Sequence, residues 1–140
     1  MTSRLTHALV AGALGAVFAA SPLAALSPLP LDGVAFVVEW GPKGQPADEK
    51  DDLLTFRDGQ FHSTACDKYG FRKGAYQAIA QGADVVFTAE TTSDKQGRLA
   101  WKGRIESTTI EGTIVHYRKP WLLDPKPTPK ELWFKGRLKQ

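Results

Sequence analysis

Apolar and polar residues alternate in short runs from Val34 onward, and turn residues break these runs about every ten positions. Every second residue from 34 to 40 is apolar, and the same alternation recurs from 85 to 89. A period of two is typical of a strand that buries one face. Residues 75–80 could form a strand or a short helix, and we favour a strand. The pattern thus predicts about eight strands, around residues 34–40, 54–56, 61–64, 75–80, 85–90, 99–106, 110–117 and 132–138.

The breaks between these runs are rich in turn residues. Asp58 and Gly59 give the strongest signal, because an Asp-Gly pair between two strands is typical of a two-residue hairpin turn of type I′. We expect longer connections after Gly41, where an open loop includes the acidic stretch at 48–52, at 65–74, and in the proline-rich segment 119–130. No strong amphipathic helix is predicted after residue 25, so the fold class is all-β.

A weak internal repeat favours closure of the sheet. Residues 101–105, 110–114 and 134–138 each have the order apolar, charged, glycine, polar, aliphatic, with the glycine on the apolar face. Glycine weakens a strand, so its placement there indicates sharp coiling or a close approach of two backbones. Sequential antiparallel strands also hide their edges by closing on themselves. We therefore predict a single small antiparallel, mostly up-and-down closed β-barrel of about eight strands over residues 34–140.

The N-terminal segment has the pattern of a secretory signal peptide. Arg4 is the only charged side chain before Asp32, an apolar run extends from 8 to 20, and small residues follow as far as Ala25. A membrane anchor usually needs about 20 continuous apolar residues, and Ser21 and Pro22 interrupt this run. We expect residues 1–25 to be a cleaved signal peptide, residues 26–33 a flexible tether, and the protein to be periplasmic or secreted, with no membrane span after cleavage.

Charge and cysteine content narrow the function classes. The formal net charge is +3, whereas a nucleic-acid-binding surface is strongly basic and clustered, so no nucleic-acid partner is expected. We interpret the acidic stretch at 48–52 and the basic C-terminal stretch at 130–139 as solvated surface. Cys66 is the only cysteine, which excludes an internal disulfide. The domain must therefore be held together by packing and strand pairing.

Several short motifs follow one another along most of this region. They are F-x-D-G-x-F-x-S at 56–63, the single Cys66, Gly70-Phe71, V-x-F-x-A-E-x-x-S at 85–93, W-x-G-x-I at 101–105, I-E-G-T at 110–113, and F-K-G at 134–136. This series resembles small lipocalin-like (calycin-type) β-barrel proteins of bacterial periplasms, whose function is uncharacterised. The Gly-x-Trp signature of lipocalins is absent. The resemblance implies a barrel fold and transfers no functional residue.

The sequence contains no local motif of a known catalytic or metal site. Cys66 with His116 could form a nucleophile and base, and His62 with Cys66 and Asp67 could bind a metal, but no local signature supports either. We expect a buried, inert thiol and a structural histidine instead. A carboxylate pair at 106 and 111 is expected to form surface ion pairs with Lys102 and Arg104. The predicted catalytic, metal and cofactor sites are therefore none, and we expect a protein that is not an enzyme.

Aromatic residues supply the remaining candidates. Seven of them fall on the predicted interior face, where they could fill the barrel or line a pocket: Phe36, Trp40, Phe56, Phe61, Phe87, Trp101 and Phe134. His116 shares the inward face of Ile110 and Ile114, as a pocket group or as a core histidine bonded to a backbone carbonyl. The candidate ligand-binding residues are His116, Trp101, Phe87 and Trp40.

Three functions are weighed on this basis. The first is binding of a small apolar ligand, the second is a periplasmic protein-interaction or inhibitor module, and the third is an enzyme. An apolar cavity with one or two inward polar groups would favour the first. A filled barrel with an exposed Trp121 or Trp133 would favour the second.

Overall fold

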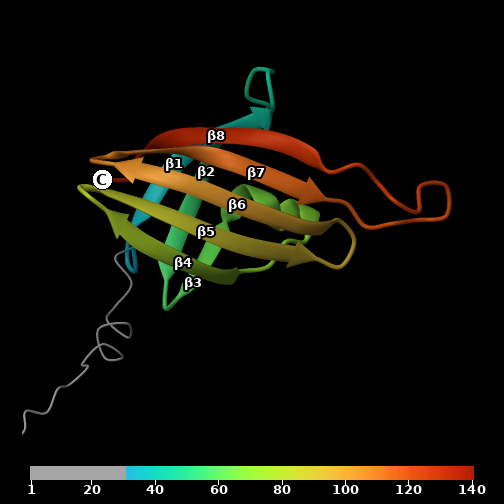
Figure 1. Cartoon of the computed structure of the whole chain (residues 1–140), viewed down its shortest axis with the longest axis horizontal. Helices are drawn as coiled ribbons and strands as arrows, with labels where there is room; N and C mark the ends of the chain where they lie inside the picture. The colour runs from blue at the N-terminus through green and yellow to red at the C-terminus, as the bar shows by residue number, and fades with distance from the viewer. Residues whose placement is uncertain (1–30) are drawn as a thin grey trace, which may run out of the picture.

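The computed structural model describes residues 31–140 (Figure 1). The predicted signal peptide at 1–25 and the first five residues of the predicted tether lie outside this range. The described chain has eight strands and one short 3₁₀ helix, η1. Their bounds are β1 (Ala35–Pro42), β2 (Glu49–Arg57), β3 (Gln60–Ser63), η1 (Thr64–Tyr69), β4 (Gly74–Gln81), β5 (Asp84–Ser93), β6 (Gly97–Glu106), β7 (Thr109–Tyr117) and β8 (Lys130–Leu138).

The strands form a closed barrel in which each pairs with the next along the chain and β8 pairs with β1. All of these pairings are antiparallel, as Figure 1 shows for β4 to β8 on the near face. Closure leaves no free sheet edge among these strands. The prediction of an all-β, up-and-down, closed antiparallel barrel of about eight strands is confirmed.

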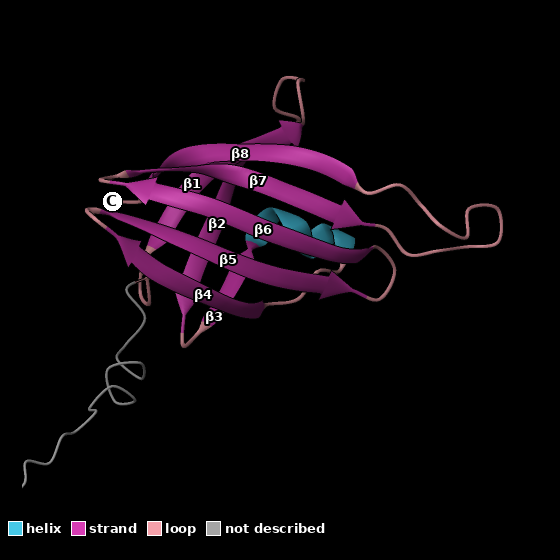
Figure 2. Cartoon of the chain, viewed as in Figure 1, coloured by secondary structure: helices cyan, strands magenta, loops and turns pink. Residues whose placement is uncertain are grey.

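The two ends of the barrel differ in the length of their connections. At one end the strands are joined by short turns, including the β2–β3 turn, where Asp58 and Gly59 have φ of 52° and 75°. Two successive positive φ angles are those of the predicted type I′ turn. The other end, called the mouth here, carries the segments 43–48, 64–73, 94–96 and 118–129. Figure 2 shows η1 against the barrel toward the mouth.

Aromatic rings fill the interior below the mouth. Ring centroids lie 5.0 Å apart for Phe56 and Phe87, 4.7 Å for Phe61 and Trp101, and 5.4 Å for Trp101 and Phe134. The first and third pairs are edge-to-face and the second is tilted, and such contacts add to the large apolar area that these side chains bury. Of the seven predicted interior aromatics, six are at most 1% exposed: Phe36, Phe56, Phe61, Phe87, Trp101 and Phe134.

Two glycines of the internal repeat, Gly103 and Gly112, leave room for these rings because they lack a side chain. Gly103 and Gly112 face each other in the β6–β7 register. A Cβ on Gly103 would lie 2.5 Å from Cε1 of Phe87 and 2.8 Å from Cζ of Phe134, and a Cβ on Gly112 would lie 2.6 Å from Cα of Gly103. Both positions therefore have a geometric reason to lack a side chain, as the sequence pattern indicated.

One seam of the barrel is much shorter than the others. β3 and β4 pair only at Gln60 with Ala75 and at Phe61 with Gly74. By contrast, β5 and β6 are in register over nine residue pairs. The chain leaves β3 at Ser63, passes through η1, and returns to the sheet only at Gly74, which shortens the pairing.

Three local expectations need correction. The acidic stretch is not wholly a solvated loop: β2 begins at Glu49, and Asp52 is 1% exposed because it shares the inward face of Leu54 and Phe56. The end of the predicted tether is bound to the barrel, since Leu31 is 3% exposed and the Gly33 N–H donates to the Phe56 carbonyl at 2.7 Å. The loop predicted at 65–74 contains most of η1.

Candidate ligand-binding site at the barrel mouth

A cavity of about 340 Å³ opens at the mouth, between the barrel wall and η1. Its apolar wall comes from four strands and from the segment after η1, and consists of Trp40, Phe71, Leu99, Ile114 and Leu132. The other lining residues are Asp48, Glu49, Cys66, Tyr69, Gln96, His116 and Lys130. The cavity thus combines an apolar wall with polar and charged side chains.

Strand alternation places the apolar wall. Leu99 precedes Trp101 by two positions on β6, so both point inward and Leu99 lies nearer the mouth. Ile114 and His116 are likewise two positions apart on β7, which runs toward the mouth, so both line the cavity and His116 lies nearer the mouth. The cavity therefore ends where the aromatic packing begins. The barrel is filled in one part and hollow in the other.

His116 is one of the polar side chains that the strands contribute to this cavity. Its Nε2 lies 2.6 Å from the carbonyl oxygen of Gln96, and its ring centroid lies 6.0 Å from that of Phe71. A carbonyl only accepts hydrogen bonds, so Nε2 carries the proton and donates. In the neutral ring Nδ1 is then an acceptor. The ring is thus bonded to a backbone carbonyl and also lines the cavity, and its role in ligand binding stays a prediction.

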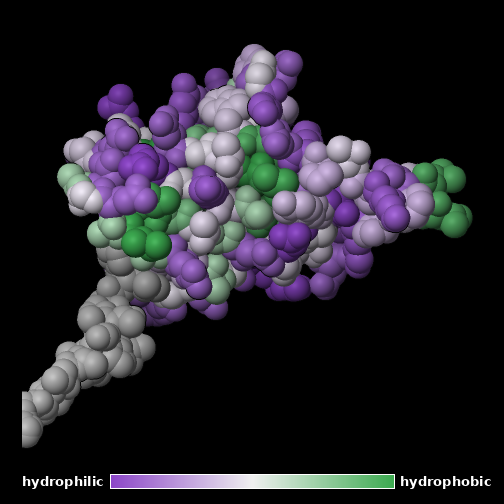
Figure 3. Space-filling model, viewed as in Figure 1, coloured by the Kyte–Doolittle hydropathy of each residue, from purple (hydrophilic) through white to green (hydrophobic). Residues whose placement is uncertain are grey.

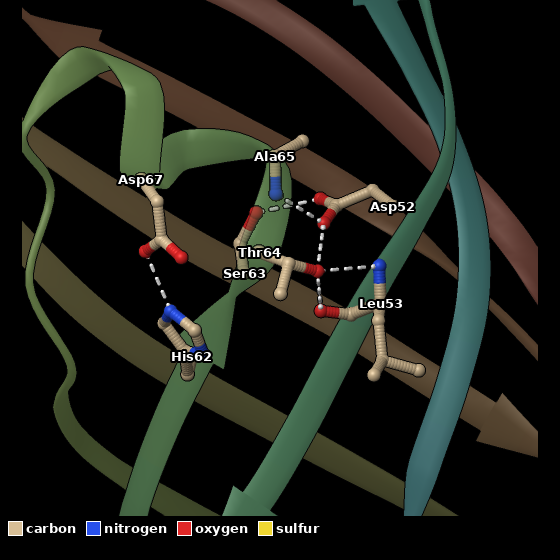
Figure 4. A network of polar contacts seen from close by, with 7 residues as sticks. All are labelled: Asp52, Leu53, His62, Ser63, Thr64, Ala65 and Asp67. Carbon is tan, nitrogen blue, oxygen red and sulfur yellow. Dashed lines mark hydrogen bonds and ion pairs between the residues drawn. The ribbon is translucent and has the colours of Figure 1, made fainter.

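Trp40 is held on the cavity wall by a buried carboxylate. Its Nε1 donates to Oδ2 of Asp52 at 3.0 Å. The same oxygen accepts the hydroxyl of Ser63 at 2.6 Å, and Oδ1 accepts the backbone N–H of Ala65 at 2.9 Å. Figure 4 shows Ser63 and Ala65 converging on Asp52. Asp52 therefore ties β1, β2 and the start of η1 together beneath the mouth.

A second set of hydrogen bonds, made by Thr64 and Asp67, also fixes the start of η1. Thr64 Oγ1 accepts the Leu53 N–H and donates to the Leu53 carbonyl, both at 3.0 Å, so it closes on the backbone of β2 (Figure 4). His62 Nε2 lies 2.7 Å from Oδ1 of Asp67. Every buried side-chain nitrogen or oxygen within residues 31–140 has a hydrogen-bond partner. The hydrogen bonds of Asp52 and Thr64 thus make a pre-formed polar frame that holds Trp40 and the start of η1 in place.

The structure brings together two of the four candidate ligand-binding residues. Trp40 and His116 both line the cavity. Phe87 and Trp101 are 1% exposed and belong to the aromatic packing, where the indole Nε1 of Trp101 donates to Thr91 Oγ1 at 3.3 Å. They lie outside the cavity lining and support it from below.

The sequence did not single out most of the other lining residues. Leu99 and Leu132 could have been found from their place at the mouth ends of inward-facing strand positions, once an up-and-down topology is assumed. The sequence pattern predicts a loop that includes Tyr69 and Phe71. No local sequence signal indicates that this loop folds over the mouth. Glu49 lies at the start of β2, and its carboxylate is bound by Lys68 Nζ at 2.9 Å.

Cys66 and His116 line the same cavity, and the thiol is held in its protonated form. Cys66 is 3% exposed, and burial raises the pKa of its thiol to about 12, which keeps it protonated. The Nε2 of His116 is engaged by Gln96. Within residues 31–140 there is no group of three or more His, Cys, Asp or Glu side chains placed to bind a metal ion.

The expected surface pairing of Glu106 and Glu111 with Lys102 and Arg104 is wrong in one respect. The Arg104 guanidinium instead binds Asp84 at 2.9 Å, across the β5–β6 pair. Cross-strand neighbours on a sheet face are close enough for such pairs.

Comparison with known proteins gives no relative from which a function could be transferred. No protein-family model matches the chain, and no curated protein or solved structure matches it. Of the residues that the structure describes, none belongs to a helix long and apolar enough to span a membrane.

Proposed function

We propose that this protein is an exported, lipocalin-like barrel that binds a small, mostly apolar molecule in the mouth cavity and does not catalyse a reaction. The observation that carries the proposal is the cavity itself, about 340 Å³ with an aromatic and aliphatic wall. Ligand sites are typically concave, about 300–1,000 Å³, mainly apolar, and equipped with a few placed polar groups. His116 and Lys130 are such groups at this cavity.

The lining favours a ligand with an apolar body and one polar end. The body would lie against Trp40, Leu99 and Ile114. The polar end would face Nδ1 of His116, which can accept a hydrogen bond when the ring is neutral. The pre-formed frame around Asp52 means that little ordering of the wall accompanies binding, which favours affinity.

The proposal is tested by titrating the protein with the neutral apolar fluorophore N-phenyl-1-naphthylamine. We expect saturable binding to the wild type. His116→Phe removes the polar group, and Leu99→Trp fills the cavity without changing His116; each should weaken binding by about tenfold or more. Tyr117→Phe is the matched control, because Tyr117 neighbours His116 on β7 and is 38% exposed. Circular dichroism checks that each variant keeps its strands.

The outcome that contradicts the proposal is the failure of the wild type to bind the probe, or equal binding by all four proteins. Export is tested separately by N-terminal sequencing of the protein from its own cells. We expect the first residue to lie just after a cleavage point between Ala19 and Ala25. An intact N-terminus beginning at Met1 would contradict export and leave the ligand proposal standing.

The interaction-module alternative rests on other residues. Trp133 is half-buried, and its Nε1 donates to the Gln45 carbonyl at 2.8 Å. Trp121 is 59% exposed. Because the barrel has a cavity at the mouth, the ligand-binding function is the better supported of the two.

A further inference from the structure

The connection between β7 and β8 projects from the mouth end of the barrel (Figure 1). Its outer part is a tight two-residue turn: the Trp121 N–H donates to the Asp124 carbonyl at 3.1 Å, and the Asp124 N–H donates back at 2.9 Å. Leu122 and Leu123 occupy the turn and are 91% and 77% exposed. Together with Trp121 they form the apolar tip, residues 121–123, and Figure 3 shows hydrophobic surface at the end of this projection.

The apolar tip is held away from the barrel rather than folded onto it. Prolines at 120, 125, 127 and 129 limit the backbone on both sides of the turn. At the base of the loop, Arg118 donates to the Thr128 carbonyl at 3.2 Å, and Lys119 Nζ donates to the Asp94 carbonyl at 2.7 Å. These restraints order the loop before any contact is made. Contiguous exposed apolar residues on a soluble domain mark a surface that is covered by something else.

The charges around the apolar tip indicate what covers it. Residues 118–130 contain the bases Arg118, Lys119, Lys126 and Lys130 and a single acid, Asp124. That acid lies 3.8 Å from Arg118 and is therefore already paired. Exposed tryptophan and leucine on a loop of net positive charge are typical of segments that insert into a membrane interface with anionic headgroups.

We infer that residues 121–123 insert into the headgroup region of an anionic lipid bilayer, toward which the net positive charge of the loop, four bases against one acid, draws them. A bilayer fits this tip better than a protein does. The tip is convex and three residues wide, whereas a stable protein interface buries about 800 Å² on each partner. A lipid surface needs no complementary groove, and shallow insertion of a few apolar side chains with electrostatic attraction is sufficient for reversible binding. The inference does not depend on the ligand proposed for the cavity.

The test is co-sedimentation with vesicles of phosphatidylcholine and phosphatidylglycerol in a ratio of about 7:3. The double variant Leu122→Ser, Leu123→Ser should lower the partition coefficient about tenfold or more. Ile79→Ser is the matched control, since Ile79 is 68% exposed on β4 and lies outside the loop. All proteins are produced from the full-length sequence with the same N-terminus, so any contribution of the apolar segment at 8–20 is equal among them.

A second readout reports on the apolar tip alone. The difference between wild-type and Trp121→Phe emission isolates one indole, because the remaining tryptophans are at 40, 101 and 133. We expect this difference emission to shift to the blue on anionic vesicles, and less on phosphatidylcholine alone or at high salt.

Two results would overturn the inference. One is equal partitioning of the wild type and the double leucine variant together with an unshifted Trp121 emission at saturating lipid. The other is a wild-type protein that stays in the supernatant at millimolar lipid, which would assign the apolar tip to a protein partner instead.

Discussion

Replacement of Asp52 by Asn tests whether the buried carboxylate holds the mouth together. Asp52 is 1% exposed and accepts the fixed N–H groups of Trp40 and Ala65 on different oxygens. An amide of the same shape has only one oxygen. Whichever way it is oriented, its NH₂ group faces one of these two N–H donors, which cannot rotate to become acceptors.

The expected magnitude follows from that count. One buried N–H loses its acceptor, at a cost of about 1–3 kcal/mol. The surviving bonds are no longer assisted by a negative charge and become weaker. We therefore expect Asp52→Asn to reduce the free energy of unfolding by about 2–4 kcal/mol. That is a large part of the total for a domain of this size.

The assay is urea unfolding followed by circular dichroism. With an m-value of about 2 kcal/mol per molar urea, the midpoint should fall by about 1–2 M without a change in slope. Asp51→Asn is the matched control: Asp51 is exposed on the same strand, and its φ of 59° is one that Asn adopts readily. Its midpoint should stay close to that of the wild type. If both variants have the same midpoint, the carboxylate does not stabilise the fold in the way described.

Three further predictions concern stability, and each is checked by unfolding curves. Gly59→Val should cost about 1–3 kcal/mol through its φ of 75° alone, since nothing lies within 4 Å of an added Cβ, and an unchanged midpoint would contradict the turn geometry. Trp101→Ala should cost about 3–5 kcal/mol, whereas Lys102→Ala, on the outer face, should stay within about 0.5 kcal/mol; comparable losses would mean that the inward face is misassigned. Burial, and then the hydrogen bond to Asp32, raise the pKa of Tyr76 above its usual 10.0, so the wild type should lose stability as the pH rises through that value. Tyr76→Phe should lose less over the same range, and parallel pH profiles would refute the assignment.

The barrel was predictable from sequence because strands and hairpin turns are determined by neighbouring residues along the chain. Alternation at 34–40 and 85–89 defines strands, and the pair Asp58 and Gly59 favours the type I′ turn, whose twist matches that of the flanking strands. Once strands follow one another through short turns, neighbours along the chain pair with each other. The inward aromatics then follow from the period of two alone.

The candidate site was only partly predictable because it depends on contacts between distant segments. Trp40 and His116 were found by alternation, since each lies on an inward strand position. The burial of Asp52 was not predicted, because a charged residue in an acidic stretch indicates exposed surface even though Asp52 alternates with Leu54 and Phe56. Its burial is favourable only because Ser63, Ala65 and Trp40 donate hydrogen bonds to its carboxylate. Phe71 reaches the mouth because of the path after η1, which no period in the sequence records.

The short seam between β3 and β4 has a consequence for how the barrel moves. A closed sheet separates first where the fewest ladder bonds must break, and only Gln60 and Phe61 pair across this line. Amide exchange at these positions should therefore be faster than along β5 and β6, which pair over nine positions. Phe61, stacked near Phe87 with centroids 6.0 Å apart, would swing outward with such an opening. We therefore expect the barrel wall to open first between β3 and β4, which would give solvent a lateral route to the interior while the other seven strand pairs stay closed.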